Sequence, residues 1–341
     1  MLPEHRKDLT RRLPDELAYP YFAGREAAWL LHRRLERPTR IAEVRRGPLA
    51  PLLGRPGVRD CVRACGDGRL TPGRLLPLAD PLALVEGRAQ PDYDSAAEAA
   101  FQALCGADVE PFIVTFDDWD ANGRSDWRWN QTSRRGGNLV VQVNFPETYR
   151  DAFNRLFGQE RREWLEYWSH PVRRDGPITM GWARLDMDPG GDEVLVEEVQ
   201  TDWLRTIRYH RRGLVEQVRR ASGKAAERQA KEFLAATAER YAPIWAEAIL
   251  LAAITVAREY LRARTVWLHQ PEAGAKLKRI HDRHPPRSLY TDLPRRFCFE
   301  ATNRAPQILY RARSQAVHRL RRAPRPVFWR MALEAKAGND G

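Results

Sequence analysis

The chain has 341 residues and 43% of them are hydrophobic, so it is long enough and apolar enough to bury a core. Lysine and arginine outnumber aspartate and glutamate by 57 to 45, and the net charge of +12 favours polyanionic partners such as nucleic acid. No apolar run approaches the ~20 residues of a membrane span, and the first residues lack the core of a secretory signal, so we expect a cytoplasmic protein with no membrane partner.

Residues 1–108 are predicted to form a basic helical N-terminal layer. A helix is expected over 24–36, with Trp29 and Leu30 on its apolar side, and another over 96–105, which Ser95 caps and Gly106 closes. The segment between them is rich in proline and predicts short helices and turns. The four cysteines form neither a disulfide framework nor a zinc pattern, which indicates reduced thiols: Cys61, Cys65, Cys105 and Cys298.

Two clusters follow the first predicted strand, over 111–116. The acidic segment 117–120 is typical of a cation site or of a solvated turn. The second cluster interleaves aromatic and basic side chains, as platforms for single-stranded nucleic acid do, and it equally fits a tryptophan-anchored loop with extended arginines. Its members are Trp127, Arg128, Trp129, Arg134 and Arg135.

An α/β core is predicted over 109–310. Its expected strands lie at 138–144, at 265–269, in a hairpin at 178–203, after a turn in the segment 288–302, and at 307–310. Its expected helices span 147–157, 159–168, an arginine-rich insertion at 204–240 with breaks at Gly213 and Gly223, a buried helix at 244–262, and 272–281. Residues 311–341 are predicted to form a basic helix and a tail, of which 327–331 pack back on the body. The fold class is therefore α+β, or mixed α/β.

The hairpin carries carboxylates and an amide where a buried strand would carry apolar residues, which suggests a site. A turn at 189–191 predicts Trp182 across from Glu198 and Arg184 across from Val196, so that both flank Glu198. Alternation along the strand places Glu198 and Gln200 on the face of Val194 and Val196, with Glu197 on the other face.

Two catalytic interpretations of the hairpin compete. Asp186 with Glu198 and Gln200 superficially matches the metal nucleases of the PD-(D/E)xK type. In the predicted register, however, Asp186 and Glu198 lie roughly 13 Å apart, which is too far for one ion unless the hairpin is irregular. The second interpretation needs no metal, because a partly dried Glu198 is suited to deprotonating an amine.

The segment 194–203, Val-Leu-Val-Glu-Glu-Val-Gln-Thr-Asp-Trp, resembles the "EIQSDW" signature of large polyvalent proteins of phages and conjugative elements. In those proteins an Ala-rich helix, a strand and an "FYDxxLP" motif follow, and residues 244–269 and 289–294 are similar in order. The same order is similar to the back half of GNAT-type acyl-CoA N-acyltransferases. That resemblance implies an acyl-CoA cofactor, Glu198 as the base with Gln200 beside it, and Tyr290 as the acid.

The resemblance also implies a pyrophosphate loop after Gln200, of which Arg211, Arg212 and Gly213 are the nearest remnant. Trp182, Arg184, Asp202 and Trp203 are then the expected neighbours of the site. A third set, His269 with His281 and His284, fits a metal site or solvated histidines.

Three functions remain open from the sequence. The first is a GNAT-like acyltransferase of mobile-element type that acts on or near nucleic acid. The second is a non-catalytic basic protein that binds nucleic acid or another partner through a degenerate enzyme fold, and the third is a metal-dependent nuclease. A purely structural role, in which Glu197 and Glu198 pair with arginines, also stays open.

Overall fold

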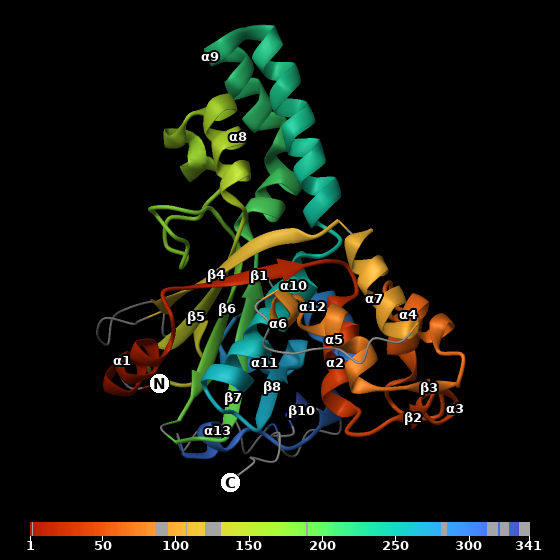
Figure 1. Cartoon of the computed structure of the whole chain (residues 1–341). Helices are drawn as coiled ribbons and strands as arrows, with labels where there is room; N and C mark the ends of the chain where they lie inside the picture. Colours follow the sequence, from red (N-terminus) through yellow and green to blue (C-terminus); the bar gives the residue numbers. More distant parts are fainter. Residues whose placement is uncertain are drawn as a thin grey trace.

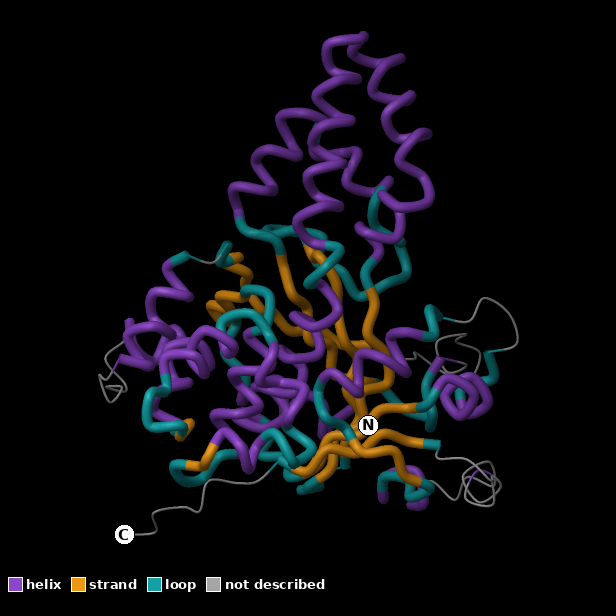
Figure 2. Tube along the Cα trace, turned by 90° about the vertical axis from the view of Figure 1, so that its right-hand side faces the viewer, coloured by secondary structure: helices purple, strands orange, loops and turns teal. Residues whose placement is uncertain are grey.

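The computed structural model describes residues 1, 3–85, 95–106, 108–119, 131–188, 190–280, 285–311, 320 and 327–333. An eight-stranded sheet crosses the molecule with helices around it, which confirms the mixed α/β class (Figures 1 and 2). In spatial order its strands are β1 (Glu16–Tyr21), β4 (Glu110–Trp119), β5 (Asn138–Asn144), β6 (Thr179–Met187), β7 (Glu193–Gln200), β8 (Thr265–His269), β10 (Phe328–Ala332) and β9 (Glu300–Thr302). A separate pair joins β2 (Thr39–Arg40) to β3 (Arg69–Leu70).

Only the β7–β8 pair of the large sheet is parallel among the described strands. A parallel pair needs a long crossover, because the chain must return to the starting edge before it can form the second strand. The crossover consists of α9 (Asp202–Tyr241) and α10 (Trp245–Thr255), and α10 continues into the π-helical turn Val256–Tyr260.

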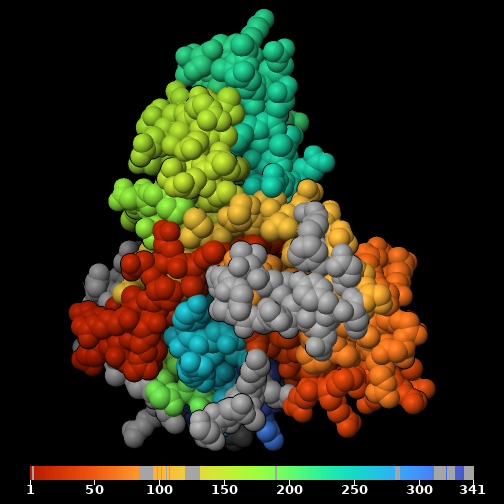
Figure 3. All heavy atoms as spheres, in the orientation of Figure 1, coloured from red at the N-terminus to blue at the C-terminus, as the bar shows by residue number. Residues whose placement is uncertain are grey.

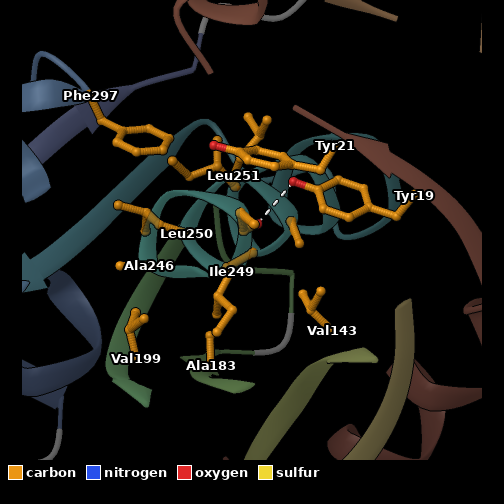
Figure 4. Packing of buried hydrophobic residues seen from close by; sticks show 14 of the residues in the cluster. Tyr19, Tyr21, Val143, Ala183, Val199, Ala246, Ile249, Leu250, Leu251 and Phe297 are labelled. Carbon is orange, nitrogen blue, oxygen red and sulfur yellow. Dashed lines mark hydrogen bonds between the residues drawn. The ribbon is translucent and has the colours of Figure 1, made fainter. Parts of the chain in front are cut away.

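Helix α10 is apolar nearly all round and is buried, as its sequence predicts. Figure 4 shows it between the sheet residues Val143, Ala183 and Val199 on one side and Tyr19 and Tyr21 on the other. The hydroxyl of Tyr19 donates a hydrogen bond to the Ala248 carbonyl at 2.9 Å. Among the described residues no single helix is long and apolar enough to cross a bilayer, and α9 and α10 meet that criterion only together, across a 52° bend.

The predicted insertion is α9, which with α8 (Glu147–Phe157) forms a lobe that stands away from the sheet (Figures 1 and 3). The chain reverses at Gly223, whose φ of 83° lies in the left-handed region that glycine adopts without strain. The break predicted at Gly213 is wrong, because that residue is helical. Aromatic rings at the base of the lobe join it to the sheet: Phe145, Tyr149, Phe153, Trp203 and Tyr241.

The N-terminal region is not a separate layer, because it supplies β1 to the sheet and shares one continuous core with the rest of the chain. Cys61 and Cys65 lie buried in it as reduced thiols. Its helices are α1 (Pro3–Arg12), α2 (Arg25–Arg34), α3 (Ile41–Val44), the 3-10 turn Ala50–Gly54, α4 (Val58–Ala64), α5 (Pro72–Ala79), α6 (Pro81–Val85) and α7 (Ser95–Cys105).

The C-terminal third departs from the prediction in two places. The strand expected at 307–310 is helical, as part of α13 (Gln307–Arg311), and the turn expected after residue 288 is α12 (Ser288–Arg296). The segment expected to pack back on the body does so as β10, which enters the sheet between β8 and β9 because Phe328, Trp329 and Met331 bury their side chains there. Helix α11 (Pro271–Leu277) follows β8, and the 3-10 turn Gln159–Trp164 replaces the helix expected at 159–168.

Candidate functional site

The site is organised by a β-bulge in the central hairpin. Arg184 pairs with Glu198 and Leu185 pairs with Val196, so Glu197 is the extra residue on β7. Between the turn and the bulge, Met187 lies opposite Val194, which is a shift of one residue from the predicted pairing. Beyond the bulge, the shift from the predicted pairing is two residues. The predicted pairs were therefore wrong: Arg184 lies opposite Glu198, and Trp182 lies opposite Gln200.

The bulge also corrects the predicted faces of β7. Val194 and Val196 pack in the α10 core, whereas Glu197 contacts Ser133 on the opposite face and Glu198 is joined to Gln131 on that face through Arg184. The Ser133 backbone N–H donates to Glu197 Oε1 at 3.0 Å. Two adjacent carboxylates thus share one face, because a bulge places successive side chains on the same side.

Arg184 holds Glu198 in place. Its Nη2 donates to Glu198 Oε2 and, at 2.8 Å, to the Gln131 carbonyl. The guanidinium carbon lies 4.6 Å from the ring centroid of Trp119 and 5.9 Å from that of Trp182, within the range of cation–π attraction. Of the two predicted neighbours of Glu198, Arg184 contacts it, whereas Trp182 lies opposite Gln200 and contacts the Arg184 guanidinium.

Glu198 is ionised at neutral pH. Burial by itself would raise the pKa of its carboxyl, but the Arg184 guanidinium and the Lys278 ammonium together hold it below its usual value. The side chain remains 17% exposed. A charged, partly exposed carboxylate can accept a proton from a bound group, although its lowered pKa makes it a weaker base than an unpaired carboxylate.

Gln200 joins a second group at the carboxyl end of β7. Its amide donates to Asp202 Oδ1 at 3.0 Å, and Nδ1 of His170 lies 2.8 Å from the same oxygen. Asp202 at the start of α9 thus orients the imidazole through Nδ1, which leaves Nε2 as the nitrogen for another partner. His170 also lowers the pKa of Glu198, so the two groups are electrostatically connected.

Sequence reasoning missed His170. It lies in the loop before β6, more than 25 residues from Glu198, and no local pattern marks it. The centroid of its imidazole ring lies 4.8 Å from that of the Tyr167 ring and 5.5 Å from that of the Trp182 ring, so both rings pack against it. Only the packing of that loop against β6 brings it to the site.

Tyr290 of α12 approaches β7 where the β7–β8 ladder has ended. The ladder's last pair is Val196–Leu268, but β7 continues to Gln200. Burial raises the pKa of the Tyr290 hydroxyl, and the Glu198 carboxylate raises it further, whereas a hydrogen bond to the Val199 backbone opposes the shift. The hydroxyl is therefore protonated at neutral pH, and its hydrogen bond to Val199 places it one residue along β7 from Glu198.

Glu197 occupies a closed polar cluster between β7 and β8. Its Oε2 accepts from Ser133 Oγ at 2.8 Å and lies 3.1 Å from His269 Nε2 and 3.5 Å from Lys278 Nζ, while Lys278 also donates to the Glu197 backbone carbonyl. These cations and donors lower the pKa of Glu197 against the effect of its burial. Burial lowers the pKa of His269.

This cluster is not a Ser–His–Glu nucleophile. A hydrolytic triad needs serine and carboxylate on opposite imidazole nitrogens, but Ser133 and Glu197 both contact His269 Nε2. Nδ1 of His269 is buried without a partner among the described residues, and the ring is fully buried. The cluster instead stabilises the bulge, because Lys278 donates a hydrogen bond to the Glu197 backbone carbonyl, and Glu197 has no partner residue in the described ladders.

Several predicted site residues lie elsewhere. Trp203 is a core residue in the aromatic cluster below α9, where its Nε1 donates to Glu166 Oε1 at 3.4 Å. Arg211, Arg212 and Gly213 lie in the first half of α9, where helical hydrogen bonds use their backbone N–H groups. The prediction of a pyrophosphate loop at these residues is therefore wrong.

The acidic residues that the structure describes do not assemble a metal centre. Asp186 binds the Met1 amino group at 2.9 Å and Arg134 at 2.6 Å, and Asp118 binds Arg6 at 2.8 Å. Within the described ranges no three His, Cys, Asp or Glu side chains could hold a metal ion. Arg134, which the sequence placed in a nucleic-acid platform, is paired with Asp186 and Asp188. The rest of that predicted platform at 127–129, and His281 and His284 of the predicted histidine set, lie outside the described residues.

Comparisons with protein-family models, with curated proteins and with solved structures give no match for this chain.

Proposed function

We propose that the chain is a GNAT-like, acyl-CoA-dependent N-acyltransferase. The observation that carries the proposal is the end of the β7–β8 ladder at Val196–Leu268, where β7 continues beside the hydroxyl of Tyr290. Strand β8 ends at His269, so the β7 backbone beyond Val196 has no described strand beside it on this edge, as an extended acyl-CoA ligand would require. With α9 as an insertion after β7, the succession β7, α10, β8, α11 and the last strands supports the same family.

The residues fit the thioester end of an acyl-CoA better than its phosphates. Beyond Val196 the β7 backbone has no partner strand on this side, and its contacts come from the side chains of Lys278 and Tyr290. Such contacts can be exchanged for those of an extended ligand. No loop in the described ranges replaces the pyrophosphate loop missing at 211–213, and Lys278 is a cation beside this stretch of β7.

In the proposed reaction, a bound acyl-CoA supplies the activated acyl group. Glu198 takes the proton from the attacking amine as the new C–N bond forms. Tyr290 gives its hydroxyl proton to the sulfur as the C–S bond breaks, and the products are an amide and a free thiol. Proton transfer by a positioned side chain contributes about 10²- to 10⁴-fold to such a rate.

Calorimetry with acetyl-CoA and a thiol-release assay with a panel of amines test the proposal. Wild-type protein should bind the cofactor and release thiol, and Glu198→Gln and Tyr290→Phe should each lower kcat by about 10²-fold or more. Glu166→Gln is the matched control, because Glu166 is also a buried, arginine-paired carboxylate but lies outside the site. Absence of acetyl-CoA binding, or equal losses in all three variants, would refute the proposal.

A further inference from the structure

The lobe carries an exposed surface of aromatic rings and arginines. In the described part of the chain, the large hydrophobic side chains that stand open to solvent are Tyr167 (52%), Trp168 (74%) and Tyr209 (65%). Large exposed apolar side chains that gather in one place mark interaction sites, whereas single ones need no explanation. Their positions therefore decide whether they form one surface.

Tyr167 and Trp168 lie at the base of α9. A turn closed by the His170 N–H and the Tyr167 carbonyl at 2.9 Å places Trp168 at its corner. The Tyr167 backbone N–H also donates to Asp202 Oδ2, on the first turn of α9. The Asp202 face of the helix is thus the face beside the two rings.

Helical geometry continues this face along α9. At 100° per residue, Arg205, Tyr209 and Arg212 follow Asp202 on one side of the helix, and Tyr209 lies about 10 Å beyond it. Arg208 borders the same side, and its guanidinium lies 5.4 Å from the Tyr209 ring centroid. Arg211, although adjacent to Arg212, points about 160° away from Tyr209.

Within this surface, Arg205 is paired with Asp202, and the charges of Arg208 and Arg212 are not neutralised by a described carboxylate. Between Asp202 and Glu216 the chain has four arginines and no acid. Among the described residues no carboxylate pairs with Arg208 or Arg212, whereas Arg219 and Arg220 farther along α9 pair with Glu216. Asp202 itself is occupied by His170 and Arg205.

We infer that this aromatic–arginine surface binds single-stranded nucleic acid. Its members are Tyr167, Trp168, Arg205, Arg208, Tyr209 and Arg212. Rings that stack on bases and arginines that follow the phosphates are the two components of sequence-tolerant single-strand binding. Exposed rings distinguish this ligand from duplex DNA, whose stacked bases offer no free face. The inference does not depend on acyl transfer.

Fluorescence anisotropy with a labelled single-stranded oligonucleotide, in DNA and RNA versions, tests the inference on the full chain. Trp168→Ala and Tyr209→Leu should each weaken binding by about 5- to 150-fold, and Tyr209→Phe should retain most of it. Arg212→Gln should reduce the slope of log K against log salt by about 0.7, and the matched control Arg211→Gln, one residue away on the opposite face, should leave it nearly unchanged.

Three outcomes would overturn the inference. The first is no binding of either oligonucleotide at low salt. The second is equal affinity for duplex and single strand together with equal effects of Arg211→Gln and Arg212→Gln, which would indicate general charge attraction. The third is retention of binding in Tyr209→Leu, because a leucine keeps apolar area and loses stacking. Each variant changes an exposed side chain, and circular dichroism verifies that it folds.

Discussion

The ion pair between Arg184 and Glu198 provides the sharpest test of how the site is held. Arg184→Met keeps a stem that packs between Trp119 and Trp182 but removes the charge, and it leaves Glu198 without its main partner. Removal of one partner of a buried pair costs about 3 to 5 kcal/mol. Because Glu198 retains 17% exposure and can recruit water, we expect about 3 kcal/mol, the lower end of that range.

The reverse change should cost more. Glu198→Gln leaves the Arg184 guanidinium fully buried with its charge uncompensated, and Nε and Nη1 already have no partner in the described structure. We expect a loss of about 5 kcal/mol for this variant. Arg184→Met/Glu198→Gln leaves no isolated charge and should be more stable than Glu198→Gln alone.

Urea unfolding of the wild type, the two single variants and the double variant gives the coupling energy between Arg184 and Glu198 from the unfolding midpoints, provided that the m-values agree. A coupling of at least 2 kcal/mol is expected for side chains that share a hydrogen bond, since contacting pairs span about 0.5 to 3 kcal/mol. A coupling below about 0.5 kcal/mol would show that the two side chains act independently, and it would refute the assignment of Arg184 as the group that positions Glu198.

Two further predictions concern the sheet and the polar cluster. Gly181→Ala should destabilise the fold by about 1 to 3 kcal/mol, because its Cβ would lie 2.4 Å from Ile249 Cδ1 and 2.6 Å from the Gln200 carbonyl. Gly213→Ala on open helix should instead stabilise it by up to about 1 kcal/mol, and urea unfolding of both variants gives the comparison. His269 has a lowered pKa in the folded protein, so the unfolded chain binds a proton first as the pH falls below about 6.5, and stability is lost in that direction. His269→Gln should therefore show a smaller loss of unfolding free energy between pH 6.5 and 5, and identical slopes in the two proteins would contradict the burial of a neutral imidazole.

Local patterns predicted the elements that short-range chemistry determines. The strand at 138–144, the helix at 147–157 and the strand at 265–269 have the bounds expected from their apolar runs and from flanking residues such as Pro146. Helix α12 was misread because Pro294 suggests a turn, although the proline is tolerated near the end of a short helix. Strand β10 pairs with residues of β8 that lie 59 to 67 residues earlier in the chain, so pairing and not local preference determines its place.

The site was predicted in part for the same reason. Glu198, Gln200 and Arg184 lie together because they belong to one hairpin, and hairpin neighbours are readable from sequence within one or two residues of register. His170 lies in a loop and Lys278 lies at the end of α11. Only tertiary packing brings these two residues to the hairpin. The pyrophosphate remnant failed because the first half of α9, which is helical up to the reversal at Gly223, occupies the place where the resemblance implies a loop.

The bulge at Glu197 explains why β7 is apolar where it begins and polar where it ends. Val194, Val196 and Val199 all pack in the α10 core, and their spacing changes from two residues to three. A regular strand would place Glu198 and Gln200 against α10 beside the first two valines, where an unpaired carboxylate is costly. The extra residue restores Val199 to the core and turns Glu198 and Gln200 toward Arg184 and His170. The valine spacing is therefore the feature of the sequence that requires the bulge, and with it the site.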